Sequence, residues 1–469
     1  MPENVIVALI SSISGIRGTI GGKPGEGLSP VDVVNFTSAY GTWINKTEQN
    51  KIVTLGRDAR PSGLMVKNLV SSTLTSMGIS VIDLDFATTP TVEMAVTGSN
   101  AGGGIIITAS HNPENWNALK LLNSKGQFLS PAEAAEIFSI AESGNFEYSQ
   151  VNQLGSISTS EEWLNYHITK ILELKLVSPE KIKALAPRII VDVVNSVGSI
   201  AVPALLQRLG ITEFKILNGE MNGHFTHNPE PLPENLGELS SEVVKGNFDL
   251  GIAVDPDVDR LSFVCEDGTF FGEEYTLVSI ADYWLSHYPG NTVSNLSSSR
   301  ALRDITLKHG GKYSAAAVGE INVVEEMLKT NAVVGGEGNG GVIIPDLHYG
   351  RDALAGIALF LSQMAASGKK VSEIRSQYPD YIISKNKILL DPSIDVDEVL
   401  SQFHILHKNE DINTLDGIKV DFADYWIHLR RSNTEPIIRI YSEAKSAETA
   451  RKLAATTINQ IENIIKAKV

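Results

Sequence analysis

Three carboxylates separated by single residues form the strongest chemical signal in the chain. They are Asp255, Asp257 and Asp259, in the segment Asp255-Pro-Asp-Val-Asp-Arg260. In extended backbone, side chains alternate between faces, so these three point the same way. Such carboxylates repel one another unless a cation lies among them, and a hard divalent ion suits oxygen ligands. The spacing therefore predicts a metal site with positions left for water and a phosphate oxygen, as Mg²⁺ prefers.

An EF-hand calcium loop is the alternative interpretation of this segment, because Glu266 stands twelfth counted from Asp255. That loop needs glycine at its sixth position, where this chain has Arg260. The apolar run Leu261–Cys265 also resembles a strand. The pattern favours a magnesium-type site over a calcium loop.

A hydroxyl in a turn is the second signal. Ser110 lies in Thr108-Ala-Ser-His-Asn-Pro113, directly after an apolar stretch. Its neighbour His111 is a catalytic candidate, although adjacent residues seldom form a nucleophile–base pair and polar residues are common in turns. Lys120 can hydrogen-bond a phosphate or carry a proton, or it can be a solvated surface lysine. With the aspartates, these residues indicate phosphoryl transfer through a phosphoserine.

Arginines with hydroxyls form the third signal, in Arg430-Arg-Ser-Asn-Thr-Glu-Pro436 and at Arg439. Guanidinium groups bind phosphate through paired hydrogen bonds. Ser432, Thr434 and the turn amides can complete an anion site. The alternative is a β-turn whose arginines are merely solvated.

A glycine-rich segment, Gly335–Gly341, carries Glu337 and Asn339. Glycine lets backbone approach a ligand closely, and a carboxylate with an amide suits sugar hydroxyls better than phosphate. A flexible loop without a ligand is the alternative.

Two further segments follow the first strands. Ser14-Gly-Ile-Arg-Gly18 offers Arg17, which we interpret as functional. Gly56-Arg-Asp-Ala-Arg-Pro-Ser-Gly63 offers Arg57 and Asp58, which we interpret as a structural network at a helix start.

Bulk composition narrows the class. A chain of 469 residues is too long to fold around one hydrophobic core. Its content of 42% hydrophobic and 20% charged residues is ordinary for a globular enzyme. A net charge of -16 argues against nucleic acid or an anionic membrane as partner. The single cysteine, Cys265, cannot form an internal disulfide. We expect a cytoplasmic protein, because we find neither a signal peptide nor a membrane-spanning stretch.

Strand-like and helix-like segments alternate, which predicts an α/β fold. Ser29-Pro30 and Ser130-Pro-Ala-Glu133 have the spacing of helix starts. The loop Asn228–Asn235 is proline-rich and should be rigid. We predict four domains, with these boundaries: 1–155, 156–265 and 266–375 as α/β domains, and 376–469 as a smaller α+β domain.

These motifs resemble those of the α-D-phosphohexomutase family, and the matches run in order from Ser14 to Arg439. The family comprises phosphoglucomutases, phosphomannomutases and phosphoglucosamine mutases. The resemblance implies three related α/β domains with mixed sheets and a smaller C-terminal α+β domain around a central cleft.

Residue by residue, the resemblance implies the following roles. Ser110 is the phosphoserine and contributes to the metal site with Asp255, Asp257 and Asp259, which bind Mg²⁺. Arg17, Lys120, His111 and Arg260 surround the reacting group. The remaining matches contact substrate: Glu337, Asn339, Arg430, Ser432, Asn433, Thr434 and Arg439.

Three departures from the family pattern concern recognition. Asn339-Gly340-Gly341 replaces a frequent Ser-Gly-His, so a usual histidine contact is missing. Ser14 stands where aspartate is common, and Pro256 where glycine is frequent. None of the departures removes a nucleophile or a metal ligand.

The resemblance implies interconversion of hexose 1- and 6-phosphates through a sugar 1,6-bisphosphate, which also serves as activator. On overall similarity we predict glucosamine phosphate as substrate, although Ser432-Asn-Thr434 also suits a glucose or mannose mutase. The motifs also leave open a phosphoenzyme phosphatase and a non-catalytic sugar-phosphate sensor. A phosphorylated hexose is the expected partner, and the protein is expected to be a monomer or homodimer.

Overall fold

A computed structural model describes residues 8–13, 15–391, 394–431 and 437–466. The chain divides into two compact units. The first comprises Met1–Trp284 and Asn339–Arg375, and the second comprises Leu285–Gly338 and Ser376–Val469. Along the chain, α9 (Glu273–His287) joins the first unit to the second.

The first unit contains a seven-stranded mixed sheet with the order β1-β2-β6-β5-β3-β4-β7. Its inner strand β3 runs parallel to β4 and β5, whereas β5, the central strand, pairs with β6 antiparallel. The strands are β1 (Leu9–Ser12), β2 (Gly15–Thr19), β3 (Ile52–Arg57), β4 (Ser80–Phe86), β5 (Gly103–Ile107), β6 (Trp116–Leu122) and β7 (Ile157–Thr159).

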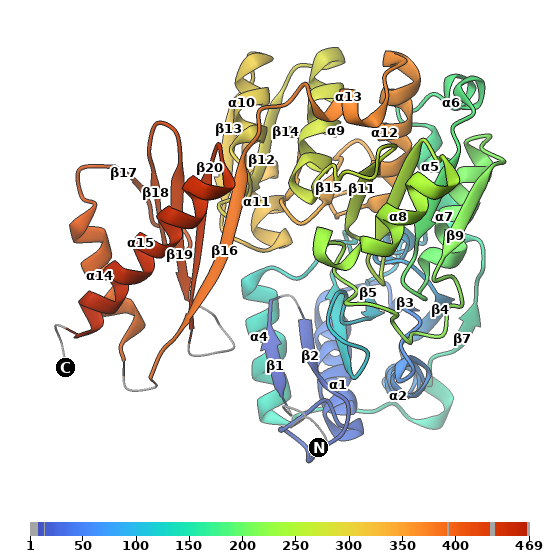
Figure 1. Cartoon of the computed structure of the whole chain (residues 1–469). Helices are drawn as coiled ribbons and strands as arrows, with labels where there is room; N and C mark the ends of the chain where they lie inside the picture. The colour runs from blue at the N-terminus through green and yellow to red at the C-terminus, as the bar shows by residue number, and fades with distance from the viewer. Residues whose placement is uncertain (1–7, 14, 392–393, 432–436, 467–469) are drawn as a thin grey trace, which may run out of the picture. The chain divides into compact units, whose positions relative to one another are not determined.

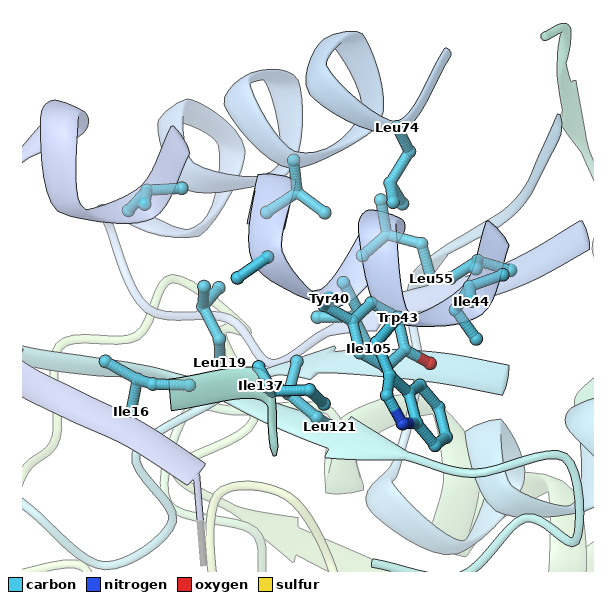
Figure 2. Close-up of a cluster of buried hydrophobic side chains, with 14 of the residues drawn as sticks. Ile16, Tyr40, Trp43, Ile44, Leu55, Leu74, Ile105, Leu119, Leu121 and Ile137 are labelled. Carbon is cyan, nitrogen blue, oxygen red and sulfur yellow. The ribbon is translucent and has the colours of Figure 1, made fainter. Parts of the chain in front are cut away.

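Helices pack on this sheet through apolar faces (Figure 1). Ser29 caps α1 and Ser130 caps α4, as the sequence predicts, and both form capping boxes in the structure. Figure 2 shows Tyr40, Trp43 and Ile44 of α1 gathered with strand residues such as Leu55 and Leu119. The helices of this part are α1 (Pro30–Thr47), α2 (Gly63–Ser76), α3 (Thr89–Gly98) and α4 (Pro131–Ser143).

A second sheet of the first unit has the order β11-β10-β8-β9, with β10 parallel to β8 and antiparallel to β11. Its strands are β8 (Ile189–Asp192), β9 (Phe214–Leu217), β10 (Leu250–Val254) and β11 (Leu261–Cys265). The remaining elements are α5 (Trp163–Leu172), α6 (Pro179–Leu185), α7 (Gly198–Arg208), α8 (Gly237–Gly246), β15 (Gly341–Ile343), α12 (Ala353–Ser367), α13 (Val371–Arg375) and the 3-10 turns Val151–Gln153 and Pro233–Asn235.

The second unit holds a parallel group, in which β12 lies between β13 and β14, and an antiparallel sheet with the order β16-β20-β19-β18-β17. Its strands are β12 (Asn291–Asn295), β13 (Tyr313–Ala316), β14 (Ala332–Glu337), β16 (Ile382–Leu389), β17 (Asp411–Asn413), β18 (Ile418–Asp421), β19 (Trp426–Arg431) and β20 (Ile437–Ala444). Its helices are α10 (Ala301–Lys308), α11 (Glu320–Thr330), α14 (Val396–Leu406) and α15 (Ala447–Lys466).

The alternating pattern of the sequence therefore predicts the α/β class correctly, and the mixed sheets agree with what the family resemblance implies. Two buried strands, β2 and β6, are among those that the sequence did not predict, because they carry glycine, asparagine or charged residues that break the apolar pattern. Within the described residues, the first strand begins at Leu9. The four domain boundaries stay a prediction.

Candidate active site

Ser110 lies in the turn that follows β5. Its backbone adopts a left-handed conformation with φ of 48°, and its amide donates to Thr108 Oγ1 at 2.9 Å. The side chain is buried, and its Oγ donates to Asp255 Oδ2 at 2.6 Å. A strained residue persists only where its surroundings hold it, and such residues concentrate at functional sites. The turn thus directs the hydroxyl to the first of the three aspartates.

Arg60 holds this turn from the loop after β3. Its side chain is fully buried and pairs with Asp58 at 3.0 Å. Its guanidinium also donates to four backbone carbonyls, those of Ser110 (2.5 Å), Asn112 (2.6 Å), Pro113 (2.5 Å) and Trp116 (3.1 Å). Asp58 in turn accepts the hydroxyl of Thr108 at 2.6 Å. The structural interpretation of Asp58 is consistent with these contacts, and Arg60 is the member of the motif that fixes the turn.

The three aspartates follow β10 in a tight loop and are completely buried. One oxygen from each lies within 4.8 Å of the others. Asp255 Oδ1 accepts the amides of Asp259 and Arg260, both at 3.1 Å, which turns the loop back on itself. Among the described residues, Asp257 Oδ1 and Asp259 Oδ1 have no hydrogen-bond partner. Buried carboxylate oxygens without donors are costly, so this donor set fits a hard divalent cation.

Burial and mutual repulsion set the charge state of this loop. Burial, followed by the charges of Asp259 and Asp257, raises the pKa of Asp255 well above its usual value. Burial would also raise the pKa of Asp257, but the charge and hydrogen bond of Lys120 lower it overall. Thr89 Oγ1 adds a 2.6 Å hydrogen bond to Asp257. The three carboxylates thus differ in how readily they lose a proton, and a cation bound among them would favour the ionised form of Asp255.

Lys120 is a buried ion-pair residue and not a solvated surface lysine. Its Nζ lies 2.6 Å from Asp257 Oδ2 and 3.3 Å from Asp259 Oδ2. Burial would lower the pKa of Lys120, but the two aspartates raise it above its usual value. Lys120 therefore holds a proton at neutral pH, next to the carboxylate loop that Ser110 contacts.

Three further predicted residues lie close enough to influence one another. Burial, followed by the charge of Arg260, lowers the pKa of Arg17. Burial and then the charges of Arg260 and Arg17 lower the pKa of His111 well below its usual value, so His111 is neutral at pH 7. Arg260 Nη1 pairs with Glu230 Oε1 at 2.7 Å. Arg17 Nη1 donates to Asn112 Oδ1 at 3.4 Å, beside the serine turn.

Arg351 is a residue of this site that the sequence did not reveal. Its Nη2 donates to Asp259 Oδ2 at 2.7 Å. The other oxygen of that carboxylate, Oδ1, accepts no hydrogen bond from the described residues. Its charge also contributes to the lowered pKa values of Arg17 and His111. The segment Tyr349-Gly-Arg-Asp352 carries an arginine next to an aspartate, but nothing in its spacing connects it to a loop ninety residues earlier.

The glycine-rich segment places Glu337 at the end of β14 in the second unit. Its Oε1 accepts from Asn295 Nδ2 at 2.8 Å and from the Gly319 amide at 3.0 Å. The carboxylate is therefore fixed by donors on two neighbouring segments. In the first unit, Asn339 Oδ1 accepts the Gly341 amide at 3.1 Å, which closes the turn before β15.

The arginine pair of the second unit occupies opposing positions on adjacent strands. Arg430 of β19 is paired with Arg439 of β20, and Arg439 is paired with Lys387 of β16 on its other side. Directly opposed residues share one face of a sheet, and like charges there are destabilising. Asp416 offsets part of this charge, at 2.9 Å from Arg430 Nε. A row of three cations, which we define as Lys387, Arg439 and Arg430, is an arrangement suited to an anion.

The predicted residues Ser432, Asn433 and Thr434 lie outside the described residues, as does Ser14. Lys387 was missed because it lies some forty residues before the arginine motif, in a strand with no turn signal. Only the pairing of β16 with β20 brings it into the row.

In the first unit, a buried serine hydroxyl beside three carboxylates is the kind of site that phosphoryl transfer requires. The second unit separately carries a row of cations suited to an anion. Family models for phosphoglucomutase/phosphomannomutase match four successive parts of the chain. They are α/β/α domain I at residues 10–148, domain II at 165–268, domain III at 272–381, and the C-terminal domain at 390–460.

Known proteins match over nearly the full length. A phosphoglucomutase/phosphomannomutase of Thermococcus kodakarensis is 36% identical over 96% of this chain and 99% of its own. A probable phosphoglucosamine mutase of Methanopyrus kandleri is 32% identical over 97% of this chain and 98% of its own. The crystal structure of a phosphoglucomutase/phosphomannomutase family protein from Burkholderia thailandensis shares the fold, with a TM-score of 0.83 at 23% identity, over 97% of this chain and 98% of that one.

The chain is thus an isomerase of the phosphotransferase type. It belongs to the phosphoglucomutase/phosphomannomutase family, within the α-D-phosphohexomutases. Within the described part of the chain, no helix is long and apolar enough to cross a membrane.

Proposed function

We propose that this phosphohexomutase acts on glucosamine phosphate, interconverting the 6- and 1-phosphates through phosphorylated Ser110 and a sugar 1,6-bisphosphate. The role of Ser110 rests on its 2.6 Å hydrogen bond to Asp255 in the aspartate loop. Two carboxylate oxygens of that loop accept no hydrogen bond from the described residues. The substrate is supported by the names of relatives such as the Methanopyrus protein. A glucose or mannose mutase is the second candidate, supported by the Thermococcus protein.

Asp255, Asp257 and Asp259 would hold Mg²⁺, which neutralises charge on the transferring phosphoryl group. Ser110 then gives its phosphoryl group to the free hydroxyl of the sugar phosphate: the bond from phosphorus to Ser110 Oγ breaks as a bond to the sugar oxygen forms. Lys120 holds a proton beside the nest and can supply it to the leaving Ser110 Oγ. His111 is neutral and can accept the proton of the sugar hydroxyl.

The return step requires the bisphosphorylated sugar to turn, so that its other phosphate faces Ser110. The row formed by Arg430, Arg439 and Lys387, with Ser432, Asn433 and Thr434, would hold whichever phosphate is not reacting. Two donors hold Glu337 in one orientation, in which its carboxylate would accept a hydrogen bond from a sugar hydroxyl. Asn339 would contact the substrate, and Arg260 would lie beside the reacting group.

The decisive experiment compares kcat/KM for glucosamine, glucose and mannose 1-phosphates, with Mg²⁺ and a hexose 1,6-bisphosphate present. A preference for glucosamine phosphate supports the proposal, and a preference for glucose or mannose phosphate selects the second candidate. Release of inorganic phosphate without isomerised sugar would indicate a phosphatase.

The variant Ser110→Ala should abolish turnover and remove the phosphate that mass spectrometry detects on the serine peptide after incubation with bisphosphate. Ser124→Ala is the matched control, because Ser124 is exposed on a turn of the same unit. Phosphate transfer that persists in Ser110→Ala would contradict the role of Ser110.

A further inference from the structure

A second cluster of potential metal ligands lies outside the aspartate loop, also within the first unit. It consists of His167 on α5, His348 before α12, and Asp352 at the start of α12. One ligand atom from each lies within 4.8 Å of the others. His167 Nε2 and His348 Nε2 both approach the same oxygen, Asp352 Oδ2, at 2.8 and 3.3 Å. Their side chains are 0%, 9% and 2% exposed, so water does not explain the convergence.

The far side of each imidazole has a partner of its own. His167 Nδ1 lies 3.0 Å from Thr91 Oγ1, and His348 Nδ1 lies 3.2 Å from Glu93 Oε2. Both partners are on α3. Metal-binding histidines almost always donate their other N–H to an oxygen acceptor, which fixes the ring and directs Nε2 to the ion. His167 has such a partner in Thr91, and Glu93 lies close enough to His348 Nδ1 to act in the same way.

The carboxylate is oriented as well. Asp352 Oδ1 caps α12 by accepting the amides of Leu354 at 2.9 Å and Ala355 at 3.1 Å. These bonds use one oxygen and direct the other, Oδ2, to the two imidazoles. Helix capping alone would not require two buried histidines on that second oxygen.

We propose that His167, His348 and Asp352 bind a divalent transition-metal ion, with Zn²⁺ as the expected occupant. Two imidazole nitrogens and one carboxylate oxygen suit zinc, cobalt or iron, whereas magnesium prefers oxygen ligands only. This site therefore selects a different ion from the aspartate loop, and it would leave one coordination position for a water molecule.

An ion bound by this cluster would also affect the aspartate loop. Asp352 lies between Arg351, which binds Asp259, and Ala353, whose amide donates to Val258 O at 3.2 Å. On α3, Thr89 binds Asp257. An ion at Asp352 would therefore fix both segments that hold the aspartate loop in place.

The test uses the full-length protein, stripped of transition metals by chelation and then titrated with Co²⁺ in the presence of excess Mg²⁺. Magnesium fills the aspartate loop, so cobalt reports the nitrogen-containing site through its visible absorption bands. We expect one equivalent of Co²⁺ in the wild type and loss of the bands in His167→Gln and His348→Gln. Glu93→Gln, which changes only an outer partner, should weaken cobalt binding by about 10–100-fold. Asp257→Asn should retain the bands.

Circular dichroism establishes that each variant is folded, and elemental analysis of the purified wild type gives an independent measure of bound zinc. Absence of stoichiometric cobalt binding by the folded wild type would overturn the proposal. Bands that survive in folded His348→Gln, or that disappear in Asp257→Asn, would overturn it as well. Both results are independent of which sugar the enzyme isomerises.

Discussion

The side chain of Arg351 lies in the space that any side chain at residue 341 would need. A Cβ placed on Gly341 would come within 2.3 Å of Arg351 Cδ, while the guanidinium of Arg351 reaches Asp259 at 2.7 Å. The glycine at 341 is therefore what admits the arginine to the aspartate loop. This gives a physical reason for the departure at Asn339-Gly340-Gly341: the arginine occupies the place that the missing histidine would otherwise need.

We predict that Gly341→Ala and Arg351→Ala weaken magnesium activation to a similar degree. Loss of a hydrogen bond to a charged group costs roughly 1.5–3 kcal/mol, or about tenfold to a hundredfold in affinity. The measurement is the Mg²⁺ concentration for half-maximal activity. Gly237→Ala is the control, because a Cβ there meets no atom within 4 Å. If the effects of Gly341→Ala and Arg351→Ala add in the double variant, then the two residues do not act through one contact.

Arg60 should determine whether the serine turn keeps its shape. Arg60→Ala removes a buried ion pair and four carbonyl contacts, so we expect a stability loss of about 3–5 kcal/mol and a large fall in kcat. Arg60→Lys should retain more stability than activity, since an ammonium cannot span four carbonyls. Thermal unfolding, kcat and hydrogen exchange of residues 108–113 are the measurements. Arg57→Lys is the control, because Arg57 pairs with Asp85 instead. Unchanged exchange in Arg60→Lys would count against this role.

Asp255 should destabilise the metal-free protein as the pH rises. The pKa of Asp255 is raised on folding, so at pH values above the usual pKa of 3.8 the folded state binds more protons than the unfolded state. The free energy of unfolding therefore decreases as the pH rises from about 3.8 through the raised pKa. Asp255→Asn removes the charge, so without Mg²⁺ it should increase the free energy of unfolding by about 0.5–2 kcal/mol at pH 7.

The gain from Asp255→Asn should shrink towards pH 4 and should disappear when Mg²⁺ is added to the wild type. Thermal unfolding from pH 4 to 8, with and without Mg²⁺, measures both effects. A gain that is the same at every pH would mean that the charge of Asp255 is not its source.

Lys387 should contribute to binding of the non-reacting phosphate, because it lies opposite Arg439 on the adjacent strand. Because Lys387 is exposed, Lys387→Ala should raise KM by only about twofold to fivefold, equivalent to roughly 0.4–1 kcal/mol. Arg439→Ala should have a larger effect, since that residue lies between two cations. Both effects should diminish at high salt. Lys385→Ala, two residues earlier on β16, is the matched control. A change in kcat with unchanged KM would contradict a role in phosphate binding.

Several elements could be predicted from local sequence because short-range chemistry fixes them. Ser29 and Ser130 cap their helices as expected, since a capping box needs residues only three apart. Strand β10 (Leu250–Val254) consists of apolar residues and one glycine, a short run that favours a buried strand. Strands β2 and β6 were missed because they are buried by tertiary pairing and not by their own pattern.

The sequence by itself determined the family, the alternation of strands and helices, and the clustering of three aspartates, because each depends on neighbouring residues. Only the tertiary structure decided which distant side chains meet them. Arg60 reaches Ser110 across fifty residues, Arg351 reaches Asp259 across ninety-two, and Lys387 joins Arg439 through strand pairing. These contacts join segments brought together by sheet order and helix packing, which no local spacing records.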